Sequence, residues 1–289
     1  MYDIAAFTMV RGIGGSIENR CLWELDGKPL LEWAIQPLKK SGRFDKIIVA
    51  TESEEIDREA TRCGAQVVRR PLDQVIDDDR DFNVGLEKRL KPRSFLHRRK
   101  HIVNLDMEYV LYCLLELEGY LPDILFSFSV DGPLGRPESI DRIIETFFEN
   151  EYCSTVVTIY EVAPNFWMIN PKDKKLFPIF SGAGIGLPRQ SYPELYKSGI
   201  YNLSGSPGKM IGPEVFPFRY LKYDYVIVSP EESFHVHNKD DLFLAECYMK
   251  RRLSKIKMKG GEKNEEVHHS PNDSGSGNGG YSSSSNGLN

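Results

Sequence analysis

The strongest constraint on the fold is a repeated alternation of short apolar segments and segments with helical spacing over the first 160 residues. Residues 4–10 form an apolar run typical of a buried strand, and residues 30–41 carry apolar side chains on one side of a helix that Gly42 ends. Further strands are predicted at 46–50, 65–68, 123–130 and 154–161, and further helices at 53–63, 108–119, 137–150 and 240–256. Because strand–helix–strand units with short connections give parallel strands, this order predicts an α/β, Rossmann-like, mostly parallel, doubly wound sheet.

A glycine-rich turn, Arg11-Gly12-Ile13-Gly14-Gly15-Ser16, follows the first predicted strand. Such a turn can bring several backbone N–H groups and one guanidinium to a phosphate chain, since a Cβ would hold the backbone away from the ligand. A plain structural turn is the alternative interpretation.

Composition narrows the class of protein. The chain has 289 residues and a formal net charge of −5, which argues against a general nucleic-acid binder. No stretch approaches the roughly 18 apolar residues of a membrane span. The five cysteines are an odd number without a CxxC pair, which predicts reduced thiols and a cytoplasmic protein.

The predicted domain covers residues 1–256. Two segments interrupt the alternation of predicted strands and helices. Residues 71–105 contain acidic and basic clusters and are interpreted as an insertion or lid. Residues 165–232 are interpreted as a small β-rich excursion from the domain. The Ser-, Gly- and Asn-rich tail, residues 257–289, is predicted to be disordered because it cannot bury enough apolar surface.

An ordered set of segments resembles one enzyme family. Arg11-Gly12, Gly27-Lys28-Pro29-Leu30, residues 44–56, Gly132-Pro133-Leu134 and residues 233–246 resemble the acylneuraminate cytidylyltransferases (CMP-sialic acid synthetases), over roughly residues 2–250. The resemblance implies a nucleotidyltransferase that binds CTP, a small acidic substrate and a divalent metal ion. In such enzymes a sugar-acid hydroxyl attacks the α-phosphate and pyrophosphate leaves. It also implies a homodimer through residues 165–232, with no nucleic-acid or membrane partner.

The resemblance assigns roles to individual residues. Those implied to bind the nucleotide are Arg11, Gly12, Gly14, Gly15, Ser16, Arg20 and Arg70. Those implied in catalysis are Arg11, Arg20 and Asp131, and those implied at the acceptor are Arg136, Arg189 and Gln190. The glycine-rich loop also departs from the family, with Gly15 in place of a lysine, Glu18 in place of a proline and Cys21 in place of an asparagine.

The family's Asp-x-Asp metal pair appears here as His235-Val236-His237. On a strand, residues i and i+2 point to one face, so both imidazoles could reach one ion, with Asp131 as a conceivable third ligand. Imidazole favours Mn²⁺ or Zn²⁺ over Mg²⁺, which prefers oxygen ligands. Two other interpretations stay open: catalytic histidines without a metal, and two histidines that only form hydrogen bonds.

The predicted function is transfer of CMP from CTP to a sugar acid or a small phosphonate, with release of pyrophosphate. Two alternatives are a degenerate, non-catalytic member that binds a nucleotide in a regulatory role, and a nucleotidyltransferase that uses another NTP and a sugar phosphate.

Overall fold

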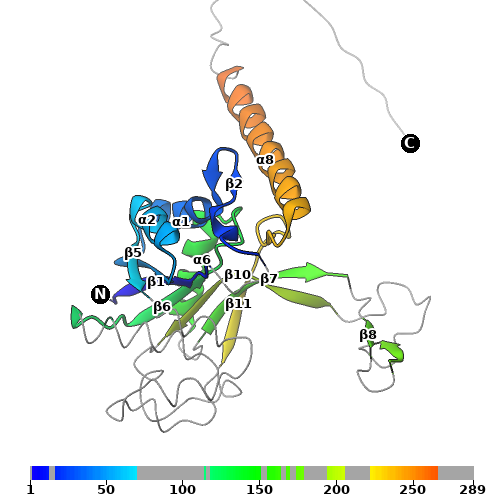
Figure 1. The fold of residues 1–289 in the computed structure, drawn as a ribbon. Coiled ribbons are helices and arrows are strands. Elements are labelled where there is room, and N and C mark those ends of the chain that lie inside the picture. The colour runs from blue at the N-terminus through cyan, green and yellow to red at the C-terminus, as the bar shows by residue number, and fades with distance from the viewer. Residues whose placement is uncertain are drawn as a thin grey trace, which may run out of the picture. The chain divides into compact units, whose positions relative to one another are not determined.

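The computed structural model describes residues 2–12, 17–69, 114, 118–150, 155–163, 167–169, 174–178, 194–205 and 222–265. A seven-stranded sheet in the order β11-β7-β10-β6-β1-β4-β5 lies at its centre (Figure 1). Its strands are β1 (Ile4–Met9), β4 (Lys46–Thr51), β5 (Gln66–Arg69), β6 (Ile124–Phe128), β7 (Thr155–Val162), β10 (Leu195–Gly205) and β11 (Tyr223–Ile227).

The sheet is mostly parallel, as predicted. Strands β5, β4, β1 and β6 pair in parallel, and so do β7 and β11, whereas β10 runs antiparallel to both of its neighbours. β10 and β11 lie within the segment 165–232, so these two strands of the segment belong to the central sheet. Among the described residues, only β8 (Trp167–Ile169) and β9 (Leu176–Pro178) form a separate strand pair in this segment.

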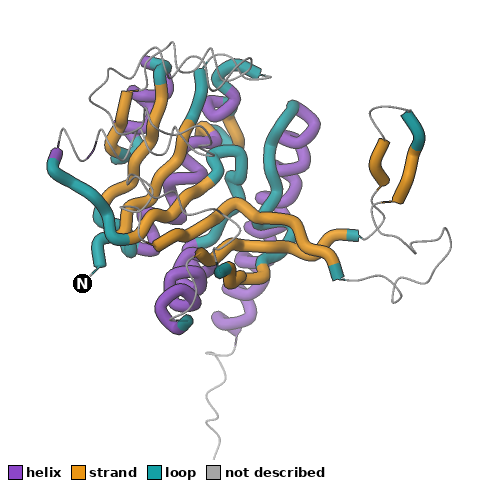
Figure 2. Tube along the Cα trace, turned by 90° about the horizontal axis from the view of Figure 1, so that it is seen from below, coloured by secondary structure: helices purple, strands orange, loops and turns teal. Residues whose placement is uncertain are grey.

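The helices begin and end close to the predicted residues. They are α1 (Leu30–Ser41), α2 (Glu54–Arg62), α6 (Pro137–Glu149) and α8 (Lys239–Glu265), seen as purple coils in Figure 2. Ser53 caps α2, because its Oγ accepts the Ile56 N–H at 3.4 Å. Pro37 lies inside α1 and is buried, yet the helix runs over the full predicted range. α8 continues to Glu265, past the predicted end near residue 256.

Side chains alternate between the two faces of the sheet and build a core on each. Ile4 and Ala6 pack with apolar residues of α1, α2 and α6 on one face. Ala5 and Phe7 pack with Leu114 and Leu125 on the other. Both faces of a parallel sheet must be covered, which explains the near-continuous apolar run of β1.

A small hairpin links the glycine-rich turn to α1. The 3₁₀ helix η1 (Arg20–Leu22) leads into β2 (Glu24–Leu25) and β3 (Lys28–Pro29). The two residues between these strands, Asp26 and Gly27, have φ angles of 49° and 73°. Two positive φ angles fit the tight hairpin turn for which Asp-Gly is preferred.

Several predicted segments lie outside the described residues. These are the insertion 71–105, most of the predicted helix 108–119 and the tail beyond Glu265. No helix in the part of the chain that the structure describes is both long and apolar enough to cross a membrane.

Candidate functional site

The candidate site lies where the chain reverses its direction of travel across the sheet. From β1 the chain adds β4 and β5 on one side, and then returns to place β6 on the other side of β1. In open α/β sheets, ligands bind outside the carboxyl ends of the strands at such a switch point. Arg11 and Gly12 follow β1 after one residue, and Asp131 follows β6 after two residues.

An ion pair joins the segments that follow these two strands. Arg20, the first residue of η1, donates from Nε to Oδ1 of Asp131 at 3.2 Å and from Nη2 to Oδ2. The two side chains are only 21% and 19% exposed. A two-pronged guanidinium–carboxylate contact of this kind fixes direction as well as distance. It brings together two residues that the sequence predicted to share a site.

The predicted histidine pair lies beside Asp131. The Val236 N–H donates to the Asp131 carbonyl oxygen at 2.8 Å, and the Val236 side chain is fully buried. The flanking rings of His235 and His237 have centroids 5.7 Å apart and planes 33° apart. Residues 234–237 form no strand, so the predicted strand geometry does not explain why the two rings lie side by side.

Burial favours the neutral form of His235. Burial lowers the pKa of His235 below its usual value of 6.5, and His237, Lys197 and Arg20 lower it further, whereas Asp131 raises it. A neutral imidazole can accept a proton or bind a metal ion. The backbone of His237 is fixed by Asp241 in the first turn of α8, because the His237 N–H donates to Oδ2 of Asp241 at 2.9 Å.

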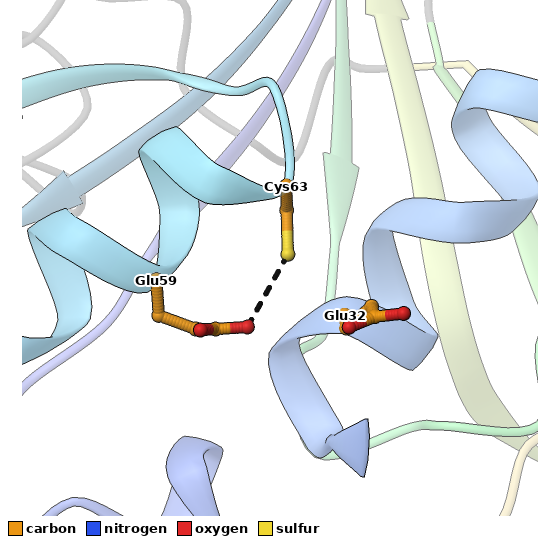
Figure 3. A group of neighbouring side chains, drawn as sticks. All are labelled: Glu32, Glu59 and Cys63. Carbon is orange, nitrogen blue, oxygen red and sulfur yellow. Dashed lines mark hydrogen bonds between the residues drawn. The ribbon is translucent and has the colours of Figure 1, made fainter.

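The expected third ligand has a different partner in this structure. Asp131 was considered as a ligand beside the histidines, but its carboxylate is bonded to Arg20. Within the described ranges, the only group of three ligand-type side chains close enough to share an ion is Glu32, Glu59 and Cys63, on α1 and at the end of α2 (Figure 3). The guanidinium of Arg62 bonds both of these glutamates, and Lys28 also pairs with Glu32, so two cations offset the two carboxylate charges there.

The other predicted residues fall into two groups. Gly12 is described, and its N–H donates to Oε1 of Glu52 at 2.6 Å, so this donor is already engaged. Arg136 precedes α6, with Nη2 and Nε at 3.7 Å and 3.8 Å from carboxylate oxygens of Glu231 and Glu232. Arg11 is described at the end of β1. Six predicted residues lie outside the described residues: Gly14, Gly15, Ser16, Arg70, Arg189 and Gln190.

The structure adds contacts that explain the two glycines of the β6–α6 loop. A Cβ on Gly132 would collide with Ile200, and one on Gly135 would lie 2.8 Å from Cζ of Tyr201 and closer still to its hydroxyl. The loop therefore lies directly on β10. Ser129 fastens its start, since its backbone N–H donates to the Ile200 carbonyl at 3.0 Å.

Sequence reasoning missed two residues at this edge. Glu52 follows β4 and bonds the glycine-rich turn, and Lys239 places its Nζ 3.5 Å from the ring centroid of Trp23, next to η1. Glu52 directly follows the buried strand β4, and a polar residue at such a position is a sequence signal that could have identified it as a site residue. No local pattern pairs Lys239 with Trp23, because they are more than 200 residues apart.

Comparison with known proteins shows which enzymes the chain resembles. Residues 16–91 match the family model for cytidylyltransferases. Curated relatives include the 3-deoxy-manno-octulosonate cytidylyltransferase of Pelodictyon phaeoclathratiforme, 24% identical over 61% of this chain. Another is the post-translational flagellin modification protein B of Campylobacter coli, 23% identical over 68% of this chain and 74% of its own length.

These likenesses differ in how much they cover. The chain spans 60% of the length of the octulosonate enzyme. The N-acylneuraminate cytidylyltransferase of Oncorhynchus mykiss is 36% identical, but over 23% of this chain and 16% of its own length. Among solved structures, a CMP:2-keto-3-deoxy-manno-octonic acid synthetase complexed with CTP superposes with a TM-score of 0.55 at 11% identity, covering 86% of this chain and 99% of that one. The chain therefore shares its fold with that synthetase.

Proposed function

We propose that this chain transfers CMP from CTP to an acidic acceptor and releases pyrophosphate. The observation that carries the proposal is the cluster of Arg20, Asp131 and His235 at the switch point of the sheet, on segments that follow β1, β6 and β11. A cation and a neutral imidazole side by side provide what phosphoryl transfer needs: neutralisation of phosphate charge and a ligand atom for a divalent ion. The Asp131 carboxylate orients the Arg20 cation.

In the proposed reaction, the acceptor oxygen forms a bond to the α-phosphorus as the bond to the β-phosphate oxygen breaks. The acceptor hydroxyl gives its proton to solvent water, and the electron pair of the broken bond stays on the leaving pyrophosphate. Positioning and neutralisation dominate such transfers. Arg11 and Arg20 supply positive charge toward the triphosphate, with Gly14, Gly15 and Ser16 as further donors and Arg70 toward the nucleoside. The acceptor's carboxylate would be met by Arg136, Arg189 and Gln190.

The histidine pair fits a divalent ion by its donor chemistry. Burial keeps His235 neutral, and the rings of His235 and His237 lie side by side with Asp131 next to them. His235 and His237 would hold the ion, and a bound ion would neutralise phosphate charge. Imidazole ligands favour Mn²⁺ or Zn²⁺ over Mg²⁺.

The acceptor class is proposed from the relatives' names and from charge. Two relatives are named for 3-deoxy-manno-octulosonate and N-acylneuraminate, both acidic sugars. Arg136 stands at the start of α6, where its cation can face an anionic acceptor. A sugar acid or a small phosphonate fits such a site.

Pyrophosphate release tests the proposal. The purified chain is assayed with each of four NTPs, with a panel of sugar acids and phosphonates, and with Mg²⁺, Mn²⁺ or Zn²⁺. We expect turnover with CTP that Arg20→Met abolishes and that Arg43→Met, an exposed guanidinium paired with Asp141, leaves unchanged. Turnover with another NTP and a sugar phosphate alone would contradict the cytidylyl assignment.

A non-catalytic role is the second candidate. It is favoured by the pairing of Arg20 and of the Gly12 N–H with carboxylates of the protein itself. In that case CTP would bind in calorimetry, while no divalent ion would support pyrophosphate release with any acceptor.

We further propose a homodimer through residues 165–232, residues 1–256 as one domain with 71–105 as its lid, and a cytoplasmic location. The apolar side chain of Ile169 in β8 is 60% exposed, which supports a dimer interface at this segment. Cys21 and Cys63 are buried free thiols, which fits the reducing conditions of the cytoplasm. Sedimentation of the full chain and of Ile169→Asp tests the dimer: a dimer that this substitution leaves intact would contradict this surface.

A further inference from the structure

The two ends of the glycine-rich turn are joined to each other. The Asn19 N–H donates to the Gly12 carbonyl oxygen at 3.1 Å, which closes the turn at its base. Asn19 has a φ of 49°, in the left-handed region where asparagine is among the best tolerated residues apart from glycine. η1 begins with the next residue, Arg20, so the closure of the turn also fixes the position of the Arg20 backbone.

The junction between β4 and α2 holds both of these ends. Oε1 of Glu52 accepts the Gly12 N–H at 2.6 Å, and Oε2 of Glu55 accepts from Nδ2 of Asn19 at 3.2 Å. Gly12 also lies against Ser53 so closely that a Cβ would come within 2.5 Å of the serine Cβ. Two carboxylates and one steric contact thus fix the base of the turn from the same side.

The junction is itself well anchored. Thr51 is fully buried, and its Oγ1 accepts the Ser53 N–H at 3.2 Å. The Val10 N–H donates to the Ala50 carbonyl at 2.9 Å, so the end of β1 is tied to β4 just before the turn begins. The position of the Glu52 carboxylate is therefore set by β4 and α2 rather than by the turn that it holds.

We propose that Glu52 is a positioning residue for the triphosphate site. Its carboxylate takes the N–H of Gly12, so this amide holds the base of the turn in place and is not a phosphate donor. Glu52 acts through the turn and does not itself touch the nucleotide. The inference rests on the proposed function for the identity of the ligand, but the fastening of the turn is measurable without one.

The test compares Glu52→Ala, Glu52→Gln and the control Glu54→Ala in the full-length chain. Glu54 is also a carboxylate at the start of α2, and its side chain faces Arg69 instead of the turn. Exchange of the Gly12 and Asn19 amides with deuterium is followed by NMR in the free protein. Affinities for CTP and for CMP, which lacks the β- and γ-phosphates, are measured by calorimetry.

Glu52→Ala is expected to speed exchange at Gly12 by about tenfold or more and to weaken CTP by a similar factor, because a charge-assisted hydrogen bond is lost. CMP affinity should change far less. Glu52→Gln keeps an oxygen that can accept the amide, so it should retain most of the protection, which keeps the test valid if the alanine variant unfolds.

Equal exchange and equal CTP affinity in Glu52→Ala and Glu54→Ala would overturn the proposal, as would equal weakening of CTP and CMP. If the wild-type chain binds no CTP while Glu52→Ala still loosens Gly12, the proposed function fails and the fastening of the turn stands.

Discussion

The ion pair between Arg20 and Asp131 is the contact that ties the glycine-rich turn to the loop after β6, so its strength can be measured as a coupling free energy. The perturbation is a double-mutant cycle with Arg20→Met, Asp131→Asn and both together, read as free energy of unfolding. Each single change removes the pair while keeping a side chain of similar length, so the cycle isolates the interaction between them.

The magnitude follows from exposure and geometry. Both side chains are about four-fifths buried, and two donor atoms of the guanidinium meet two carboxylate oxygens. Exposed pairs contribute about 0.2–1 kcal/mol, whereas breaking a fully buried pair costs about 3–5 kcal/mol. An intermediate, two-pronged pair should therefore couple by about 1–2 kcal/mol.

Urea unfolding near pH 7 measures the cycle, and the chain contains a matched control. Arg43 donates from Nε to Oδ1 of Asp141 at 3.0 Å, but those side chains are 45% and 35% exposed. The same cycle at this pair should give no more than about 0.5 kcal/mol. Coupling at Arg20 and Asp131 no larger than at the control pair would refute the view that this contact organises the site.

Three further predictions concern packing and titration. Gly135→Ala should destabilise by about 1–3 kcal/mol through collision with Tyr201, and Tyr201→Phe should recover part of that loss in urea melts, since the hydroxyl is the nearest obstacle. The pKa of His235 is lowered on folding, so the unfolded chain binds its proton more readily; in chelator, stability should fall as pH drops below about 6.5, and His235→Gln should flatten that slope. Burial raises the pKa of Cys21 to about 12, so a thiol reagent at about pH 8 should label the exposed Cys247 and spare Cys21, as peptide mapping would show.

Much of the fold could be predicted because local patterns and tertiary packing agree in its first half. The burial of Ile4 and Ala6 on one face and of Ala5 and Phe7 on the other is what a continuous apolar run means in a parallel sheet. Ser53 and Gly64 marked the ends of α2 because capping depends on residues only a few positions away.

The sequence was less informative where partners are distant along the chain. β10 belongs to the central sheet through antiparallel pairing with β6 and β7, and no local signal shows which strands it joins. The carboxylate of Asp131 bonds Arg20, 111 residues away, and no local pattern indicates this choice over the histidines, which are also distant along the chain. Likewise, the Gly12 N–H donates to Glu52 because β4 ends just before Glu52 and places this carboxylate beside the turn. The periodicity of the sequence alone does not determine that position.

The account depends on one claim, that the turn after β1 and the histidine pair face the same bound CTP. NMR of the imidazole signals of His235 and His237 during titration with CTP and a divalent ion tests it most directly. We predict that CTP shifts both signals in the wild-type chain and in Arg43→Met, and leaves them unchanged in Arg20→Met. CTP that binds without moving either imidazole, or that moves them equally in Arg20→Met, would contradict the claim.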